Sequence, residues 1–227
     1  THFSTFRINV MASLLLPSQQ PSAMCNLKPV SAASQLTLAA GFYSRDESDW
    51  IYQCLQQQQS WPDNHYVMSG RRFELPRLQT WHADPGIVYS YSNNLLETRG
   101  WSSLLLSIRR RVEMFTGHDF NAVLVNYYRD GMDYVGWHSD DEVEMGPAPV
   151  IASLSLGQPR CFQVRPLQGG QEGQGEQEET FLLDAGDLLL MAAGFQSRWQ
   201  HRVPPQPDVT GGRINLTFRR VLPPAAR

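Results

Sequence analysis

The sequence predicts an α+β fold, mainly β, with a double-stranded β-helix (jelly-roll) core braced by N-terminal helices. In the first half of the chain, apolar residues recur at helical spacing in two segments. From Asn121 onward the apolar pattern changes to a period of two, in short segments separated by Gly, Pro and Asp. Helices followed by a run of antiparallel strands are typical of a jelly roll with helices on one face.

The chain has 227 residues, 41% of them hydrophobic, which is enough for one domain with its own core. We expect a disordered tail over residues 1–23 and a single domain over residues 24–227. No apolar run approaches the roughly 20 residues that cross a bilayer. Three widely separated cysteines indicate neither a disulfide framework nor a cysteine zinc site. The cysteines suit a reducing compartment, and we expect an intracellular monomer without membrane contact, in the cytoplasm or the nucleus.

Two helices are predicted. The first covers residues 45–59, where Ser44 and Glu47 form a capping box. The second has apolar residues at positions 101, 104, 105, 108, 112 and 115, and Gly117 can end it. Three arginines at positions 109–111 leave two interpretations open. They form either a solvated helix face, which is the commoner case, or a track for phosphates.

Six strands are predicted in the second half of the chain, over residues 122–128, 150–156, 161–165, 180–183, 187–191 and 213–221. Residues 168–179 are rich in Gly, Gln and Glu, a composition that indicates an extended hairpin loop between two of these strands. The net charge of −3 does not exclude a nucleic-acid partner, because phosphate binding needs only a local basic groove.

A metal site is predicted from the segment 136–142, which reads GWHSDDE. In an extended segment, side chains two residues apart point the same way, so His138 and Asp140 can converge on one ion. His201 is the best candidate for a third ligand. Two imidazoles and one carboxylate are the typical ligand set of non-haem Fe(II) oxygenases. An isolated His-x-Asp is more often a surface turn, and this alternative stays open on the motif alone.

The strand predicted at the end of the chain has one apolar and one polar face. Arg213, Asn215, Thr217 and Arg219 share the polar face. A buried polar face is costly unless partners satisfy it, and two inward guanidiniums call for an anion such as a small dicarboxylate. The alternative is an edge strand with one side in water. Asn126 and Tyr128 also share a face of their strand, which favours a common binding site.

Together these segments resemble the AlkB family of DNA and RNA demethylases over residues 75–221. The matching pieces include PR at 76–77, YSYS at 89–92, TGHDFN at 116–121, NYYRDG at 126–131, HSDDE at 138–142, IASLSLG at 151–157 and RINLTFR at 213–219. Within this family, the segments WHSDDE and WQHRVP most resemble the animal AlkB homologues that favour single-stranded DNA and RNA.

The resemblance implies that His138, Asp140 and His201 hold Fe(II), with 2-oxoglutarate and O2 as cosubstrates. Arg213 would bind the distal carboxylate of 2-oxoglutarate, and Arg219 would lie near the metal-bound end. The remaining cosubstrate contacts would come from Asn126, Tyr128, Asn215 and Thr217. The implied reaction oxidises an N-methyl group of 1-methyladenine or 3-methylcytosine, which then leaves as formaldehyde, a form of alkylation-damage repair.

The resemblance also implies substrate contacts. Tyr89 and Tyr91 would line the pocket for the base, with Trp81 and Trp137 as further candidates that are equally well explained as core aromatics. Glu142 would lie beside the lesion, and Arg77 on the nucleic-acid side, where it could contact phosphate as Arg71 and Arg72 could.

The chain departs from the family pattern in Trp81-His82-Ala83-Asp84 and in the loop 168–179. Both departures fall where substrate would approach, so they bear on strand preference and not on the iron site. Two alternatives for the function stay open. One is a 2-oxoglutarate oxygenase that acts on a protein or small molecule. The other is a non-catalytic jelly-roll binding module.

Overall fold

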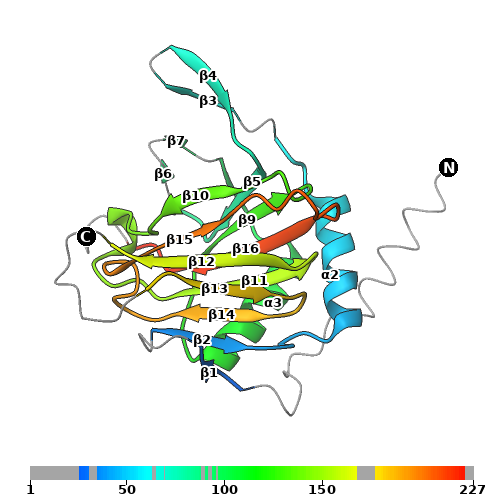
Figure 1. The fold of residues 1–227 in the computed structure, drawn as a ribbon, viewed down its shortest axis with the longest axis vertical. Coiled ribbons are helices and arrows are strands. Elements are labelled where there is room, and N and C mark those ends of the chain that lie inside the picture. Colours follow the sequence, from blue (N-terminus) through cyan, green and yellow to red (C-terminus); the bar gives the residue numbers. More distant parts are fainter. Residues whose placement is uncertain are drawn as a thin grey trace.

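The computed structural model describes residues 26–30, 35–62, 65–68, 70–87, 90–91, 94–95, 97–167 and 177–222. Within them, two sheets face each other and helices cover the outer face of the larger one (Figure 1). This is the predicted jelly roll braced by helices. The expected tail over residues 1–23 lies outside the described residues.

The larger sheet has eight strands, all paired antiparallel except the last pair, β5 and β8. In spatial order its strands are β1 (Lys28–Pro29), β2 (Leu36–Ala39), β14 (Leu188–Met191), β11 (Ile151–Gly157), β16 (Arg213–Arg219), β9 (Ala122–Tyr128), β5 (Leu78–Ala83) and β8 (Thr98–Arg99). The smaller sheet consists of β10 (Val135–His138), β15 (Trp199–Val203), β12 (Arg160–Pro166) and β13 (Glu179–Leu183), in that order.

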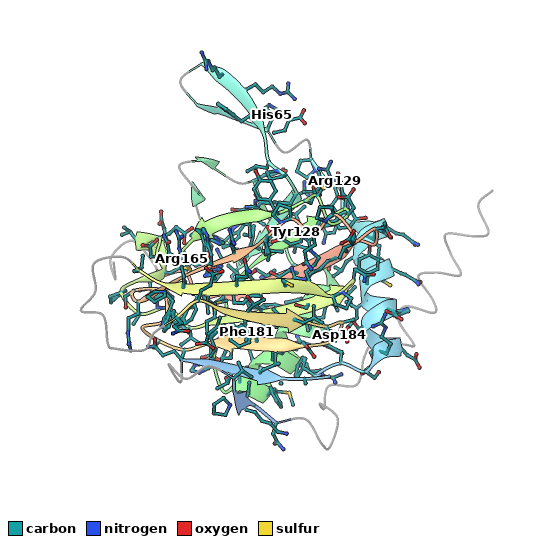
Figure 2. All side chains as sticks on the ribbon, in the orientation of Figure 1. His65, Tyr128, Arg129, Arg165, Phe181 and Asp184 are labelled. Atoms are coloured by element: carbon teal, nitrogen blue, oxygen red, sulfur yellow. The ribbon has the colours of Figure 1, made fainter. Side chains whose placement is uncertain are left out.

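Two hairpins and a short helix complete the described elements. The hairpin of β3 (His65–Met68) and β4 (Arg71–Glu74) projects from the body, so that His65 lies far from Tyr128 in the interior (Figures 1 and 2). The second hairpin pairs β6 (Ser90–Tyr91) with β7 (Asn94–Leu95), and the 3-10 helix η1 covers Val143–Met145. Among the described residues, none of the helices combines the length and apolar character needed to cross a bilayer.

Both predicted helices are present. In α2 (Arg45–Gln58), Ser44 Oγ accepts from Glu47 N while the Glu47 carboxylate accepts from Ser44 N, which is the predicted capping box. Helix α3 (Ser103–Thr116) begins after Trp101, because the Ser102 side chain caps it, and it ends at Gly117 with φ of 73°. A positive φ at this position strains residues that carry a Cβ, so glycine suits the cap.

The core has two main layers, one on each face of the larger sheet. Between this sheet and the helices lie Ile214, Leu216 and Phe218 of β16, packed against buried residues of α2 and α3. Between the two sheets lies a second cluster, which includes Phe162, Val164 and Trp199 of the smaller sheet. Strand β16 therefore turns its apolar face to the helices and its polar face to the space between the sheets, as its alternating sequence predicts.

Several expectations need correction. The last strand ends at Arg219, not at residue 221, because the Asn121 side chain pairs with the backbone of Val221. The solvated-face interpretation of residues 109–111 is wrong for Arg111, which is buried and donates to Glu47 and to the carbonyl of Phe42. Most of the predicted loop 168–179 lies outside the described residues, although the flanking strands β12 and β13 do pair as a hairpin.

Candidate metal centre

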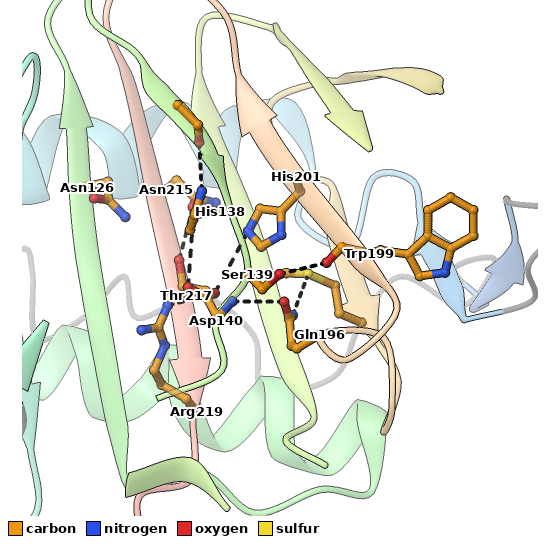
Figure 3. A network of polar contacts seen from close by, with 12 residues as sticks. Asn126, His138, Ser139, Asp140, Gln196, Trp199, His201, Asn215, Thr217 and Arg219 are labelled. Carbon is orange, nitrogen blue, oxygen red and sulfur yellow. Dashed lines mark hydrogen bonds and ion pairs between the residues drawn. The ribbon is translucent and has the colours of Figure 1, made fainter. Parts of the chain in front are cut away.

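Two histidines and one aspartate meet at the edge of the smaller sheet. His138 ends β10 and His201 lies on β15, and these two residues are paired across the ladder, with ring centroids 4.2 Å apart. Asp140 follows two residues later, and one ligand atom from each of the three side chains lies within 4.8 Å of the other two (Figure 3). Nε2 of His138 lies 3.7 Å from one Asp140 oxygen, and Nε2 of His201 lies 3.9 Å from the other.

Backbone and side-chain contacts orient this group. His138 Nδ1 donates to the carbonyl of Gly136 at 2.8 Å, which leaves the Nε2 lone pair facing Asp140. The backbone N–H of Asp140 donates to Gln196 Oε1 at 3.0 Å, and the carboxylate accepts from Arg219 at 3.0 Å. Sequence reasoning missed Gln196, a buried residue more than fifty positions away.

The electrostatics suit a cation. Burial raises the pKa of Asp140, but the neighbouring positive charge, above all that of Arg219, outweighs it, so that the net pKa lies below the usual value. Burial, and then the neighbouring His138, lower the pKa of His201 to about 3. At neutral pH the site therefore offers a carboxylate and a neutral imidazole, which are the forms that bind metal.

A pocket extends from these three residues between the sheets, with about 450 Å³ of empty space that includes some open solvent. Its polar wall belongs to β16 and β9 of the larger sheet, and consists of Arg213, Asn215, Thr217, Arg219, Asn126 and Tyr128. Its apolar lining includes Val135, Phe162 and Val203 from the smaller sheet. The structure thus brings all predicted metal and cosubstrate residues into one cavity and excludes the solvent-exposed alternatives for β16 and the His-x-Asp segment.

Arg213 is a buried cation with unused donors. Its Nη2 donates to Ser155 Oγ at 2.9 Å, and its Cζ lies 5.3 Å from the centre of the Tyr128 ring. The Nε and Nη1 atoms have no hydrogen-bond partner among the described residues. Burial lowers the pKa of Arg213 to about 10, with the Tyr128 hydroxyl acting in the opposite direction, so the guanidinium stays charged at neutral pH. An anion of matching size would satisfy these donors.

The middle of the polar wall is held in place by hydrogen bonds. Asn215 donates from Nδ2 to Ser153 Oγ at 2.8 Å and to the carbonyl of Leu154 at 3.0 Å. Thr217 then donates to Asn215 Oδ1 at 3.1 Å. Ser153 also lines the pocket, and Ser155 holds Arg213 by accepting its hydrogen bond. Sequence reasoning missed both, since two serines in a predicted strand carry no distinctive signal.

The donor set fits Fe(II) and does not fit a structural zinc site. Two imidazoles and a carboxylate on one side leave positions open for further ligands, as in non-haem iron sites, whereas structural zinc sites are closed and often contain thiolates. The unpartnered atoms of Arg213 lie in the same pocket as the three ligands. A molecule that binds the metal at one end and carries a carboxylate at the other, as 2-oxoglutarate does, fits this pocket.

Of the four predicted substrate residues, only Arg77 is seen to line the pocket within the described part of the chain. Arg77 is buried and lines the pocket, where its Nε donates to Asn126 Oδ1 at 3.1 Å, so a phosphate contact of Arg77 in solvent is not supported. Glu142 is half-buried beside η1 and is not among the pocket-lining residues. Tyr89 lies outside the described residues, as does the side chain of Tyr91.

The two tryptophan candidates differ from each other. Trp81 is a buried core residue, packed with Ala83 and Leu124. Trp137 is half-buried and contacts two arginine side chains. For Trp81 the core interpretation is the correct one.

Comparisons with known proteins agree with this geometry. A sequence model described as "2OG-Fe(II) oxygenase superfamily" matches residues 35–219. The Rattus norvegicus protein "Alpha-ketoglutarate-dependent dioxygenase alkB homolog 3" is 39% identical over 198 residues, which cover 85% of this chain and 66% of that protein. Its Homo sapiens counterpart is 38% identical over 198 residues, covering 85% of this chain and 68% of that protein.

More distant relatives match as well. The Homo sapiens protein "DNA oxidative demethylase ALKBH2" is 33% identical over 185 residues, covering 79% of this chain and 71% of that protein. The chain thus spans about two thirds of the length of these relatives. A solved structure described as "The structure of OsALKBH1" matches 82% of this chain and 98% of that chain with a TM-score of 0.56. Its 18% identity supports the fold alone.

Proposed function

This chain belongs to the 2OG-Fe(II) oxygenase superfamily, and on that premise we propose that it demethylates N-alkylated nucleobases in DNA or RNA. As a member of this superfamily, the chain is an Fe(II)- and 2-oxoglutarate-dependent dioxygenase, an enzyme class that uses O2. The observation that carries the proposal is the shared pocket of His138, Asp140, His201 and the unsatisfied Arg213. The names of the relatives, which include a DNA oxidative demethylase, support nucleobases as substrates.

Each part of the pocket has a distinct task in this proposal. His138, Asp140 and His201 would hold Fe(II), and Arg213 would bind the distal carboxylate of 2-oxoglutarate with its free Nε and Nη1 donors. Bound iron, 2-oxoglutarate and O2 supply the oxidation of the N-methyl group, whose product releases formaldehyde.

The protein supplies orientation and a partly dry cavity. Arg219 fixes one oxygen of Asp140, and Asn215 and Thr217 hold the polar wall. The apolar side chains of Val135, Phe162 and Val203 exclude water from the opposite side. Asn126 and Tyr128 would complete the cosubstrate contacts, and Tyr89, Tyr91, Arg77 and Glu142 are proposed to contact the substrate.

Finer features belong to the same proposal. We expect 1-methyladenine and 3-methylcytosine as substrates, because their positive charge at neutral pH favours aromatic contacts. A base in a single strand is already accessible, whereas a paired base must first leave its stack at a cost of a few kcal/mol. Single strands are therefore the proposed substrate, acted on by a monomer in the cytoplasm or the nucleus.

One assay tests the proposal. The protein is incubated with Fe(II), 2-oxoglutarate and ascorbate, and with 1-methyladenine in single- and double-stranded oligonucleotides. Formaldehyde and unmodified adenine are measured, with His138→Ala as the control. The proposal predicts both products in the parent, more from single strands, and neither in the variant. Succinate formed without base repair would instead indicate a protein or small molecule as substrate, and would end the nucleobase proposal.

A further inference from the structure

The strand that carries His138 is weakly held by its backbone. Among the described strands, β10 lies at the edge of the smaller sheet and pairs with β15 alone. The ladder joins Val135 to Val203 and His138 to His201, so three steps on β10 match two steps on β15. Gly136 and Trp137 therefore form a β-bulge opposite Arg202. Because the Gly136 carbonyl accepts from His138 Nδ1, this bulge sets the direction of the imidazole.

Trp137 is held on the outer face of the smaller sheet by two guanidiniums. Arg165 Cζ lies 4.3 Å from the centre of the Trp137 ring, and Arg202 Cζ lies 4.4 Å from it. Arg202 comes from β15, the strand next to β10, and Arg165 comes from β12, the next strand beyond it, where Figure 2 labels it. A guanidinium at these distances is attracted to the electron-rich face of the indole, and the attraction is stronger where water is excluded.

The two arginines are themselves oriented by glutamines across the ladder. Arg165 is paired with Gln200 and donates to its Oε1 from Nε and Nη2, at 3.1 and 2.9 Å. Arg202 is paired with Gln163 and donates from Nε to its Oε1 at 2.7 Å. These acceptors are neutral, and they leave the planar faces of the guanidiniums available for the indole. The Glu178 carboxylate lies 4.0 Å from Arg202 Nη2. Side chains of β12 and β15 thus contact β10 where its ladder with β15 shifts register.

We infer that Trp137 is a positioning residue for His138, and that Arg165 and Arg202 act through it to set the metal affinity. Beyond His138, Ser139 is anchored by its hydrogen bond to the carbonyl of Trp199. On the other side of His138, the contacts of Trp137 anchor the bulge. Loss of the indole frees the Gly136 carbonyl and lets the imidazole turn. This inference concerns the metal centre and is independent of the substrate.

The test is metal binding by the full chain, with Mn(II) as the probe in isothermal titration calorimetry and without 2-oxoglutarate. Loss of contacts that orient a ligand typically weakens metal binding by about 10–100-fold, and we expect at least a tenfold higher Kd for Trp137→Ala. Trp137→Phe keeps an aromatic face and should stay within about threefold of the parent. The free energy of unfolding of each metal-free variant is measured in urea.

Trp101→Ala is the matched control. Trp101 is also half-buried and also contacts an arginine, with Arg109 Cζ 5.0 Å from its ring, but it packs on the helix side of the larger sheet. We expect it to lose stability and to keep the parent Kd for Mn(II). Equal weakening in Trp101→Ala and Trp137→Ala would show a general loss of structure and overturn the inference.

Smaller changes keep the inference testable if Trp137→Ala does not fold. Arg165→Gln and Arg202→Gln each remove one guanidinium from the indole and should each raise the Kd for Mn(II) by a few-fold. A parent Kd in both of these variants, or in a folded Trp137→Ala, overturns the inference. Failure of the demethylation assay with intact Mn(II) binding would leave this result unaffected.

Discussion

Arg219 and Asp140 form a buried ion pair, with 3.0 Å between Nη2 and Oδ2 and side-chain exposures of 2% and 3%. The pair joins the end of β16 in the larger sheet to the segment that follows β10 in the smaller sheet (Figure 3). It commits one oxygen of Asp140 to a guanidinium while the other oxygen faces His138. The last strand thus shapes the metal centre as well as the cosubstrate pocket.

Arg219→Met should destabilise the metal-free protein by about 3–5 kcal/mol, because it leaves the Asp140 carboxylate buried without its partner. Asp140→Asn combined with Arg219→Met should recover part of this loss, since neither charge then remains. Urea unfolding of the two single variants and the double variant measures the coupling energy. Additive losses would contradict a direct interaction between the two side chains.

Arg213→Met should separate cosubstrate binding from stability. The substitution removes a buried cation that has unused donors, so we expect the free energy of unfolding without ligand to stay within about 1 kcal/mol of the parent or to rise. The KM for 2-oxoglutarate should rise at least about tenfold, because a charge-assisted carboxylate contact is lost. Steady-state kinetics and urea unfolding measure the two effects. An unchanged KM would exclude Arg213 from the cosubstrate site.

The stability of the metal-free protein should depend on pH through His201. Burial, and then His138, lower the pKa of His201 from 6.5 to about 3, so between these values the unfolded chain binds more protons than the folded one. The free energy of unfolding therefore falls as the pH drops below about 6.5, by up to about 1.4 kcal/mol per pH unit from this group. Urea titrations from pH 7 to pH 5 should show a smaller slope in His201→Gln. Equal slopes would contradict a buried neutral imidazole.

The sequence predicted the elements whose patterns are local. The alternation in β16 assigned both of its faces correctly, because the period of a strand fixes which side chains share a side. The pair His138 and Asp140 followed from a two-residue spacing. Gln196 could not be predicted from the sequence, because a single glutamine belongs to no local pattern. Its role arises only when the fold brings its side-chain amide to the backbone N–H of Asp140.

The burial of Arg111 was indicated by helical periodicity, but the charge of its arginine neighbours pointed to solvent. It follows Leu104 by seven positions and Ile108 by three, so helical periodicity places it on the apolar face of α3. The run of three arginines favoured solvent instead. Contacts with Glu47, with the Phe42 carbonyl and with the Tyr43 ring, 4.0 Å away, make burial of this charge possible.

Arg111→Ala should accordingly lower the free energy of unfolding by about 3 kcal/mol, since it breaks a buried ion pair and removes a large side chain from the core. Its exposed neighbour offers the control: Arg110→Ala should change stability by no more than about 0.5 kcal/mol. Thermal and urea unfolding compare the two variants. Equal losses of stability in the two variants would indicate that Arg111 lies on the solvated face of the helix, as Arg110 does.

The salt dependence of nucleic-acid binding should distinguish Arg77 from the arginines of the projecting hairpin. Arg77 is buried, and its guanidinium donates to Asn126 and to the carbonyl of Tyr134, so it is not placed to neutralise a phosphate in solvent. Arg71 and Arg72 are exposed on β4 (Figure 1). Neutralising one phosphate of a single strand contributes about 0.7 to the slope of log K against log salt concentration.

We therefore expect Arg71→Gln or Arg72→Gln to reduce this slope by about 0.7, and Arg77→Gln to leave it unchanged, whatever the effect of each variant on turnover. Fluorescence anisotropy of a labelled single-stranded oligonucleotide, titrated at several salt concentrations, measures the slope. A reduced slope in Arg77→Gln would mean that this guanidinium leaves Asn126 when nucleic acid binds. Because the slope counts released ions and not total affinity, it separates that rearrangement from a mere weakening of the pocket.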